Sequence, residues 1–281
     1  MKRYIISVFL LLGLAGYACD IKCPAPYDMT SLTSRFLSTV TGQKALSQFV
    51  GKKIIKKSIM KNITSGDIKT SLKSFSTRDL KAGRFKSIEI WGKEISSQGV
   101  YISYIHTKTL CDFNYITQNK KGDIIIKEDL PLAVEVEFTE SDINKTMESS
   151  DYKRIISDIN KLAGGLNVFQ IDSTYSKIKN NKFNYVIKYY IPFIKGYKII
   201  VFVSDLAAKN GEIEFENTKI LGESASLDIK YFSKLINYLN PLDFSLQIQE
   251  NKDAKINIQN VKITDNKVVA DGSITVFKDK E

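Results

Sequence analysis

The chain has 281 residues, of which 43% are hydrophobic and 26% charged, and its formal net charge is +10. This is the composition of an ordinary globular protein, long enough for one large domain or two small ones. The single histidine excludes metal motifs built from paired histidines, and the basic surplus suits anionic lipid, polyanionic cell-wall polymer or plain solubility, with no nucleic-acid partner expected.

The first 18 residues have the layout of a secretory signal peptide. Two cations precede an apolar run over residues 4–14, and small residues then lead to Cys19. The run is too short to span a bilayer comfortably, so we expect export to the periplasm or cell envelope. Gly16 and Ala18 satisfy the rule for ordinary cleavage, whereas lipoprotein processing would acylate Cys19 and anchor the chain to a membrane. Both alternatives remain open.

Three cysteines in an exported chain leave one without a partner. Acylation of Cys19 would leave Cys23 and Cys111 to form a disulfide. The alternative is that Cys111, which lies among apolar residues, is a buried free thiol. Cleavage after residue 18 would remove two cations and lower the net charge to +8.

Residues 19–65 are expected to form an N-terminal segment with an amphipathic helix. Between residues 28 and 62, apolar side chains recur at spacings near three or four or their multiples, namely at Leu32, Phe36, Val40, Phe49 and Ile59. A break is expected near Gly42 or Gly51. The basic run over residues 52–57 either lies on an anionic membrane or forms the solvated face of a packed helix, and the second arrangement is the commoner one.

From residue 66 to residue 281 the apolar period changes to two, which predicts a β-rich domain. In the clearest strand, Leu132, Val134, Val136 and Phe138 alternate with residues that include Glu135 and Glu137, so one face should contact a core. Short turns should join neighbouring strands as antiparallel pairs. Further strands are expected at residues 85–91, 100–107, 123–127, 183–191, 198–204, 212–216, 244–249, 256–264 and 268–277.

Two helices are expected to interrupt these strands. Thr139 or Ser141 can cap the first, which should run to the glycines at 164–165. Ser226 can cap the second, which should stop at Asn240 and the proline after it.

The sequence contains little that suggests catalysis. His106 alternates with Tyr104 along a predicted strand, which favours a structural role over that of a general base. No zinc-like cysteine spacing, phosphate loop or dinucleotide-binding glycine pattern is present, so we expect a protein without enzymatic activity, metal or cofactor. A hydrolase acting on envelope lipid or glycan is a minor alternative.

Residues 83–90, 92–93, 95 and 99–103 resemble the opening strands of the LmeA-like phospholipid-binding proteins. The helix start at 139–143 and the closing strands within 256–277 fit the same order, so the resemblance covers residues 66–278. It implies an α+β fold of the tubular lipid-binding, BPI-like type, with a strongly curved antiparallel β-sheet wrapped around long amphipathic helices. It also implies an apolar groove that holds phospholipid or another acyl lipid, with the membrane surface as a partner and lipid transport as a role.

The resemblance supplies no ligand contacts, so the groove candidates come from alternation and helical spacing alone. Lysines at the mouth of such a groove would receive a phosphate head group. The rival interpretation is a structural or adhesive envelope lipoprotein with a dry core. The candidate lining residues are Leu132, Val134, Val136, Phe138, Ile155, Ile159, Tyr185, Ile187, Tyr189, Val201, Val203, Phe232 and Leu235.

Overall fold

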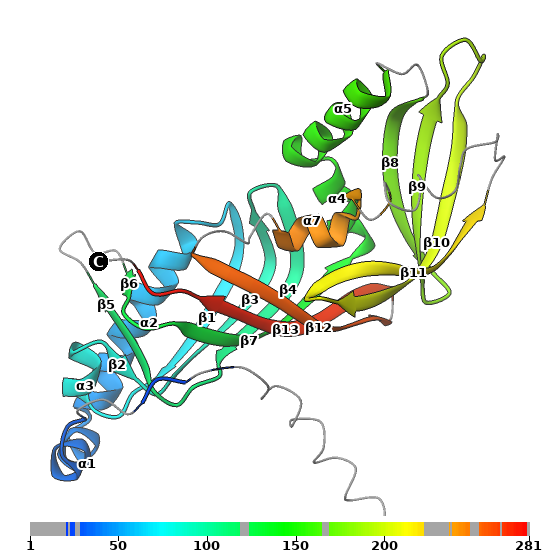
Figure 1. Cartoon of the computed structure of the whole chain (residues 1–281). Coiled ribbons are helices and arrows are strands. Elements are labelled where there is room, and N and C mark those ends of the chain that lie inside the picture. Colours follow the sequence, from blue (N-terminus) through cyan, green and yellow to red (C-terminus); the bar gives the residue numbers. More distant parts are fainter. Residues whose placement is uncertain are drawn as a thin grey trace, which may run out of the picture.

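The computed structural model describes residues 21, 23–25, 29–118, 124–164, 169–221, 236, 238–247, 253–264 and 266–279. The expected signal segment 1–18 and Cys19 lie outside them. The described part is elongated, with helices α1 (Leu32–Val40) and α2 (Gln43–Met60) at one end, a six-stranded sheet in the middle and a four-stranded sheet at the other end (Figure 1). Among the described helices, none combines the length and the apolar character that crossing a membrane requires.

The six-stranded sheet is antiparallel throughout and places the C-terminal hairpin beside a strand from the middle of the chain. On that strand, β7, Val136 and Phe138 are buried whereas Glu135 is exposed, so the predicted core-facing row is confirmed. In spatial order the strands are β1 (Ser65–Lys73), β3 (Ser87–Ser97), β4 (Val100–Thr109), β7 (Leu130–Thr139), β13 (Lys267–Val276) and β12 (Ala254–Thr264).

Two smaller antiparallel sheets complete the β structure. In the four-stranded sheet, β8 and β9 are joined by Asn180 and Asn181, both with positive φ, as a tight two-residue hairpin requires. Its order is β11 (Glu212–Leu221), β10 (Lys198–Lys209), β9 (Lys182–Tyr190) and β8 (Gln170–Lys179). The three-stranded sheet consists of β2 (Arg84–Phe85), β5 (Asn114–Gln118) and β6 (Ile124–Ile126).

The fold class implied by the resemblance is wrong. The chain consists mainly of antiparallel sheets, and its described helices are short, so no curved sheet wraps around long amphipathic helices. The 18 residues of α2 form the longest described helix, and Ile55 is its only buried residue. The other described helices are α1, α3 (Thr77–Lys81), α4 (Glu140–Met147), α5 (Ser150–Gly164) and α7 (Pro241–Gln247).

Local backbone signals explain why the expected long helices are divided. Gly42 has a φ of 70°, in the left-handed region, and separates α1 from α2. Thr139 caps α4 through a capping box with Asp142. The Ser149 hydroxyl then accepts a hydrogen bond from the Tyr152 N–H at 3.3 Å and begins a separate helix, α5. A single helix from residue 139 to 164 is therefore replaced by two.

The strand expected at residues 244–249 is wrong, because Phe244 to Gln247 are helical in α7. Pro241 occupies the first position of that helix, and the Asn240 carboxamide oxygen accepts the Leu242 N–H at 3.1 Å. Asn240 and Pro241, which were expected to end a helix, therefore begin one. Most of the helix expected from Ser226 lies outside the described residues. Strands β1, β5 and β8 were not predicted.

The buried side chains form two apolar clusters rather than one. The larger cluster lies between the four-stranded sheet, α4, α5, α7 and one half of the central sheet, and the smaller one lies between α2 and the other half. In the larger cluster the Tyr152 hydroxyl donates to the Leu239 carbonyl at 2.6 Å and lies 2.8 Å from the Tyr185 hydroxyl. Burial raises the pKa of both phenols, so both keep their protons.

Candidate functional site

Most of the predicted groove residues are packed in the interior. Ile155, Ile159, Tyr185, Ile187 and Tyr189 lie in the larger cluster, together with two residues of β7. These two are Val136 and Phe138; Leu132 belongs to the smaller cluster, and Val134 is buried between them on the same face of β7.

Four other groove candidates lie either outside the two clusters or outside the described residues. Val201 and Val203 lie on the less buried face of β10, whereas Ile200 and Phe202 point into the core. The sequence could not decide between the faces, because both are apolar from residue 199 to 203. Phe232 and Leu235 lie outside the described residues.

Those groove candidates that lie within the described residues line neither the pocket beneath α2 nor the cavity beside β8. The described candidates in the larger cluster pack together within it. A separate candidate site is found at the α2 end of the molecule.

An apolar pocket of about 590 Å³ lies beneath α2, where that helix crosses the small three-stranded sheet. Ile55, Leu72 and Phe85 are each less than 10% exposed and form its floor, whereas Leu46 and Val50 are half or more exposed and form its lip. The lining comes from α2, β1, α3, β2, β5 and β6, and consists of Gln43, Leu46, Ser47, Val50, Gly51, Ile54, Ile55, Leu72, Thr77, Leu80, Lys81, Gly83, Phe85, Ile116, Thr117 and Ile124.

Two glycines shape this pocket. A Cβ atom at Gly51 would lie 2.5 Å from a methyl group of Leu72, so the missing side chain lets α2 approach β1. At Gly83, φ is 80° and a Cβ would lie 1.7 Å from the Ile116 carbonyl oxygen, so any other residue would have to push β5 away. The Gly83 carbonyl accepts the Ile116 N–H at 3.0 Å, which fixes the loop after α3 against β5.

The chemistry of the pocket suits an apolar ligand. Its described lining is mostly aliphatic, includes one cation, Lys81, and contains no carboxylate. The few polar groups, such as Ser47 and Thr117, are short hydroxyls that can orient a ligand without requiring a charged one. Apolar side chains at i, i+4 and i+8 of α2, namely Leu46, Val50 and Ile54, were the sequence signal for this surface, but helical spacing alone does not show that it borders a hollow.

A second cavity, of about 890 Å³, lies between α5 and the edge strand β8. Its lining is mixed, with Glu148, Lys153 and Asp172 beside Met147 and Ile156. The α4 and α5 side chains bond to the free edge of β8: Asn160 accepts the Ile171 N–H at 2.7 Å and donates to its carbonyl, and Asn144 does the same for Ser176. This cavity lies where α4 and α5 cover the edge of β8. Its lining residues do not favour one class of ligand.

His106 lies outside both cavities, on β4. Its ring stacks on Trp91 of β3 with centroids 5.3 Å apart, and its Nε2 lies 2.9 Å from a Glu89 carboxylate oxygen. These are neighbouring cross-strand positions on one face of the sheet. Within the described residues, no group of three or more histidine, cysteine or acidic side chains could hold a metal ion.

Comparison with protein-family models, with curated proteins and with solved structures finds no match to this chain. The function therefore has to be argued from the pocket itself.

Proposed function

We propose that this is an exported protein that binds an acyl chain of a phospholipid or a related lipid in the pocket beneath α2. The observation that carries the proposal is the pocket itself, with a buried aliphatic floor, an exposed aliphatic lip and no described carboxylate. A volume of about 590 Å³ lies in the range of small-molecule sites.

The energetics of burial support this ligand class. Each methylene removed from water contributes about 0.8 kcal/mol, so about eight methylenes would contribute roughly 6 kcal/mol before the cost of immobilising the ligand. Lys81 at the pocket can pair with an anionic head group, while the tail occupies the aliphatic floor. The exposed lip of the pocket, Leu46 and Val50, lies on α2. We propose that the pocket retains one end of an acyl chain and does not enclose a whole lipid.

The proposal that the protein acts in the periplasm or cell envelope has separate support. Cys23 and Cys111 form a disulfide in the structure, the pairing that the sequence left as one of two alternatives. Disulfides persist mainly in oxidising compartments, which suits export under the expected signal segment.

The structural or adhesive alternative is favoured by one observation, the dry packing of the described groove candidates in the larger cluster. On that alternative the pocket beneath α2 would be a packing imperfection without a ligand. The two functions make opposite predictions for lipid uptake by the folded protein.

Native mass spectrometry of protein purified from an envelope fraction, without added lipid, tests the proposal. We expect a noncovalent mass of lipid size that is lost on denaturation, and a covalent increment on the denatured chain would separately show acylation of Cys19. Bare protein that also takes up no added phospholipid would favour the structural alternative.

A matched pair of substitutions locates the ligand. Ser47 lies on α2 and lines the apolar pocket, whereas Ser157 lies on α5 and lines the other cavity. We expect Ser47→Trp to weaken binding of a fluorescent fatty acid at least about tenfold by filling the pocket, and Ser157→Trp to leave it unchanged. Equal loss in both variants, or loss only in Ser157→Trp, would contradict the assignment of the site.

A further inference from the structure

Helix α1 packs on the protein with its polar side, so that its apolar side faces the solvent. Leu32, Phe36 and Val40 lie at i, i+4 and i+8, and they are 80%, 69% and 67% exposed. The residues turned toward the protein are polar: Arg35 is half-buried and Ser38 is the only buried residue of the helix. Helices of soluble proteins normally show the opposite arrangement.

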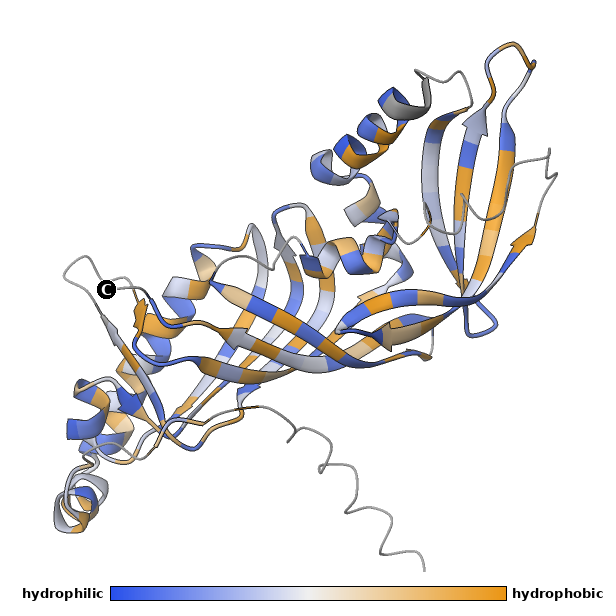
Figure 2. Cartoon of the chain, in the orientation of Figure 1, coloured by the Kyte–Doolittle hydropathy of each residue, from blue (hydrophilic) through white to orange (hydrophobic). Residues whose placement is uncertain are grey.

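The apolar surface continues from α1 onto the first half of α2. Leu37 of α1 and Leu46, Phe49 and Val50 of α2 are all at least half exposed. Figure 2 shows hydrophobic residues distributed over α1 and α2 at this end of the molecule, beside hydrophilic ones. An apolar surface of this kind on one end of a protein marks an interaction site.

The charge of the α1–α2 segment is of one sign, and two of its cations, Arg35 and Lys56, pair with acids of neighbouring elements, Asp79 and Asp67. Residues 29–66 contain seven cations and no acid, so most of the net charge of the chain lies in this segment. Lys53, Lys56 and Lys57 of α2 are exposed, and the Lys53 ammonium lies 4.6 Å from the centre of the Phe49 ring. Cations beside exposed aromatic and aliphatic side chains are the features of helices that lie on anionic membranes.

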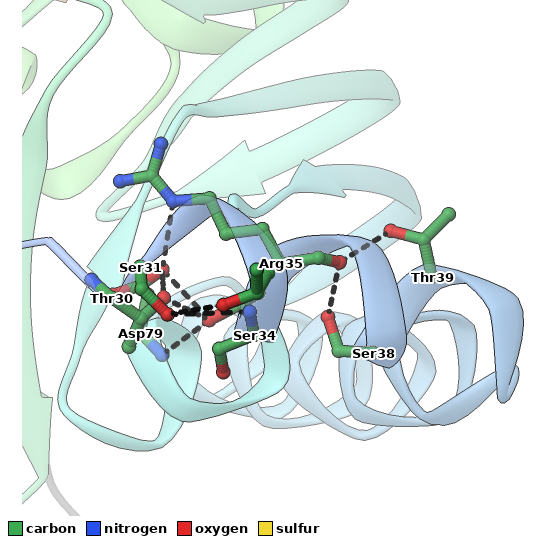
Figure 3. Close-up of polar contacts among 9 residues, drawn as sticks. Thr30, Ser31, Ser34, Arg35, Ser38, Thr39 and Asp79 are labelled. Carbon is green, nitrogen blue, oxygen red and sulfur yellow. Dashed lines mark hydrogen bonds and ion pairs between the residues drawn. The ribbon is translucent and has the colours of Figure 1, made fainter.

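A network of polar contacts holds α1 in this orientation (Figure 3). The carboxylate of Asp79 in α3 is fully buried and accepts hydrogen bonds from the N–H and hydroxyl of Thr30, at 3.1 and 2.8 Å. The Arg35 Nε lies 3.9 Å from the same carboxylate, and the guanidinium stacks over Phe75. The polar side of α1 is thus bound to the protein, which leaves the apolar side free.

We propose that the α1–α2 end docks on the surface of an anionic lipid membrane, with α1 lying in the plane of the interface. Leu32, Phe36, Leu37 and Val40 would enter the acyl region, and the lysines of α2 would contact lipid phosphates. Leu46 and Val50 belong both to this surface and to the lip of the pocket, so docking brings the pocket mouth to the membrane. The docking does not depend on what the pocket binds.

A second copy of the chain fits this surface less well. Two such ends would bring the exposed lysines of α2, among them Lys53 and Lys57, against the same lysines of the other copy, and like charges at an interface are unfavourable. An anionic membrane satisfies the apolar and the cationic features together.

Vesicle flotation tests the proposal with the whole chain, exported to a bacterial periplasm so that the disulfide forms, and carrying Cys19→Ser so that no acyl chain attaches. We expect binding to vesicles of phosphatidylglycerol and phosphatidylcholine, weakened at least about tenfold on vesicles of phosphatidylcholine alone or in about 0.5 M salt. A chain that floats with neither vesicle overturns the proposal.

Two variants and a control assign the binding to this end. Leu32→Ser with Phe36→Ser, and separately Lys53→Glu with Lys57→Glu, should each weaken vesicle binding at least about tenfold while circular dichroism stays unchanged, because all four side chains are exposed. The control is Phe193→Ser, which removes a 96% exposed aromatic from the β9–β10 connection at the opposite end.

The remaining outcomes are equally decisive. Loss of binding in Phe193→Ser but not in the α1 variant would overturn the proposal. Dimers in light scattering that disappear in the α1 variant, without vesicle binding by the parent chain, would assign the surface to self-association instead. Because Ser47→Trp should bind vesicles normally, failure of the pocket proposal and failure of the docking proposal remain distinguishable.

Discussion

At the scale of single residues, the carboxylate of Asp79 couples the attachment of α1 to pH. Burial by itself raises the pKa of Asp79, but hydrogen bonds from Ser76 and Thr30 and the charge of Arg35 together outweigh it, so the pKa lies below its usual value. A lowered folded-state pKa stabilises the protein above the pKa of the unfolded chain. That stability is lost as the pH falls through the folded-state value.

We therefore expect Asp79→Asn to lower the free energy of unfolding by about 1–3 kcal/mol near pH 6, because buried hydrogen bonds to a charged acceptor are replaced by weaker ones. Below about pH 4 the difference from the parent protein should shrink, because the parent loses its own carboxylate. Urea unfolding at a series of pH values measures this. A difference that stays constant down to pH 2 would show that Asp79 is not the group responsible.

At the scale of elements, the loop from α3 to β2 depends on a backbone conformation that the sequence marks with glycine. Gly83 and Gly196 have similar positive φ values, 80° and 89°, but different surroundings. A Cβ at Gly83 would meet the Ile116 carbonyl at 1.7 Å, whereas nothing lies within 4 Å of a Cβ at Gly196. Alanine substitutions at these two glycines therefore distinguish the effect of backbone strain from that of a steric clash.

We expect Gly196→Ala to cost about 1 kcal/mol, the penalty of a left-handed conformation alone. Gly83→Ala should cost clearly more, about 3 kcal/mol, and should weaken ligand binding in the adjacent pocket, because β5 must move away. Thermal melting and fatty-acid binding of the two variants provide the comparison. Equal losses of stability in the two variants would mean that β5 moves away from residue 83 at no cost in free energy.

At the scale of the whole molecule, two clusters share one sheet. Strand β7 contributes Leu130 and Leu132 to the cluster beneath α2 and Val136 and Phe138 to the larger cluster at the other end. The disulfide belongs to the α2 end, since Phe113, two residues from Cys111, stacks on Phe75 at 5.2 Å, beneath Arg35 of α1. One end of the molecule therefore carries the disulfide, the apolar pocket and the exposed apolar surface.

We expect Cys23→Ser to destabilise this end selectively. The disulfide closes a loop with a sequence separation of 88, for which chain entropy gives about 4.6 kcal/mol. Hydrogen exchange should become faster in α2 and β1 than in the four-stranded sheet. Cys19→Ser is the matched control, because it replaces a cysteine and keeps the Cys23–Cys111 disulfide. Equal acceleration in both sheets would show that the molecule unfolds as a single unit.

The sequence determined those features that depend on neighbours along the chain. Alternation located β7, the capping residues located the start of α4, and Gly42 marked the break before α2, because each depends on local backbone geometry. Residues 244–247 show where such local patterns fail. Their alternation predicted a strand, but they belong to a helix that begins at Pro241.

Only the tertiary structure decided which faces are covered. The period of a pattern shows which side chains share a face, but coverage depends on elements distant in sequence. For Val201 and Val203 on β10, apolar residues on both faces left the choice open. The spacing of Leu32, Phe36 and Val40 indicated one apolar face, and the contacts of Arg35 with Asp79, 44 residues later, turned that face to the solvent. The exposed apolar surface followed from this distant pairing, and the pocket beneath α2 from the packing of α2 against strands and a helix later in the chain.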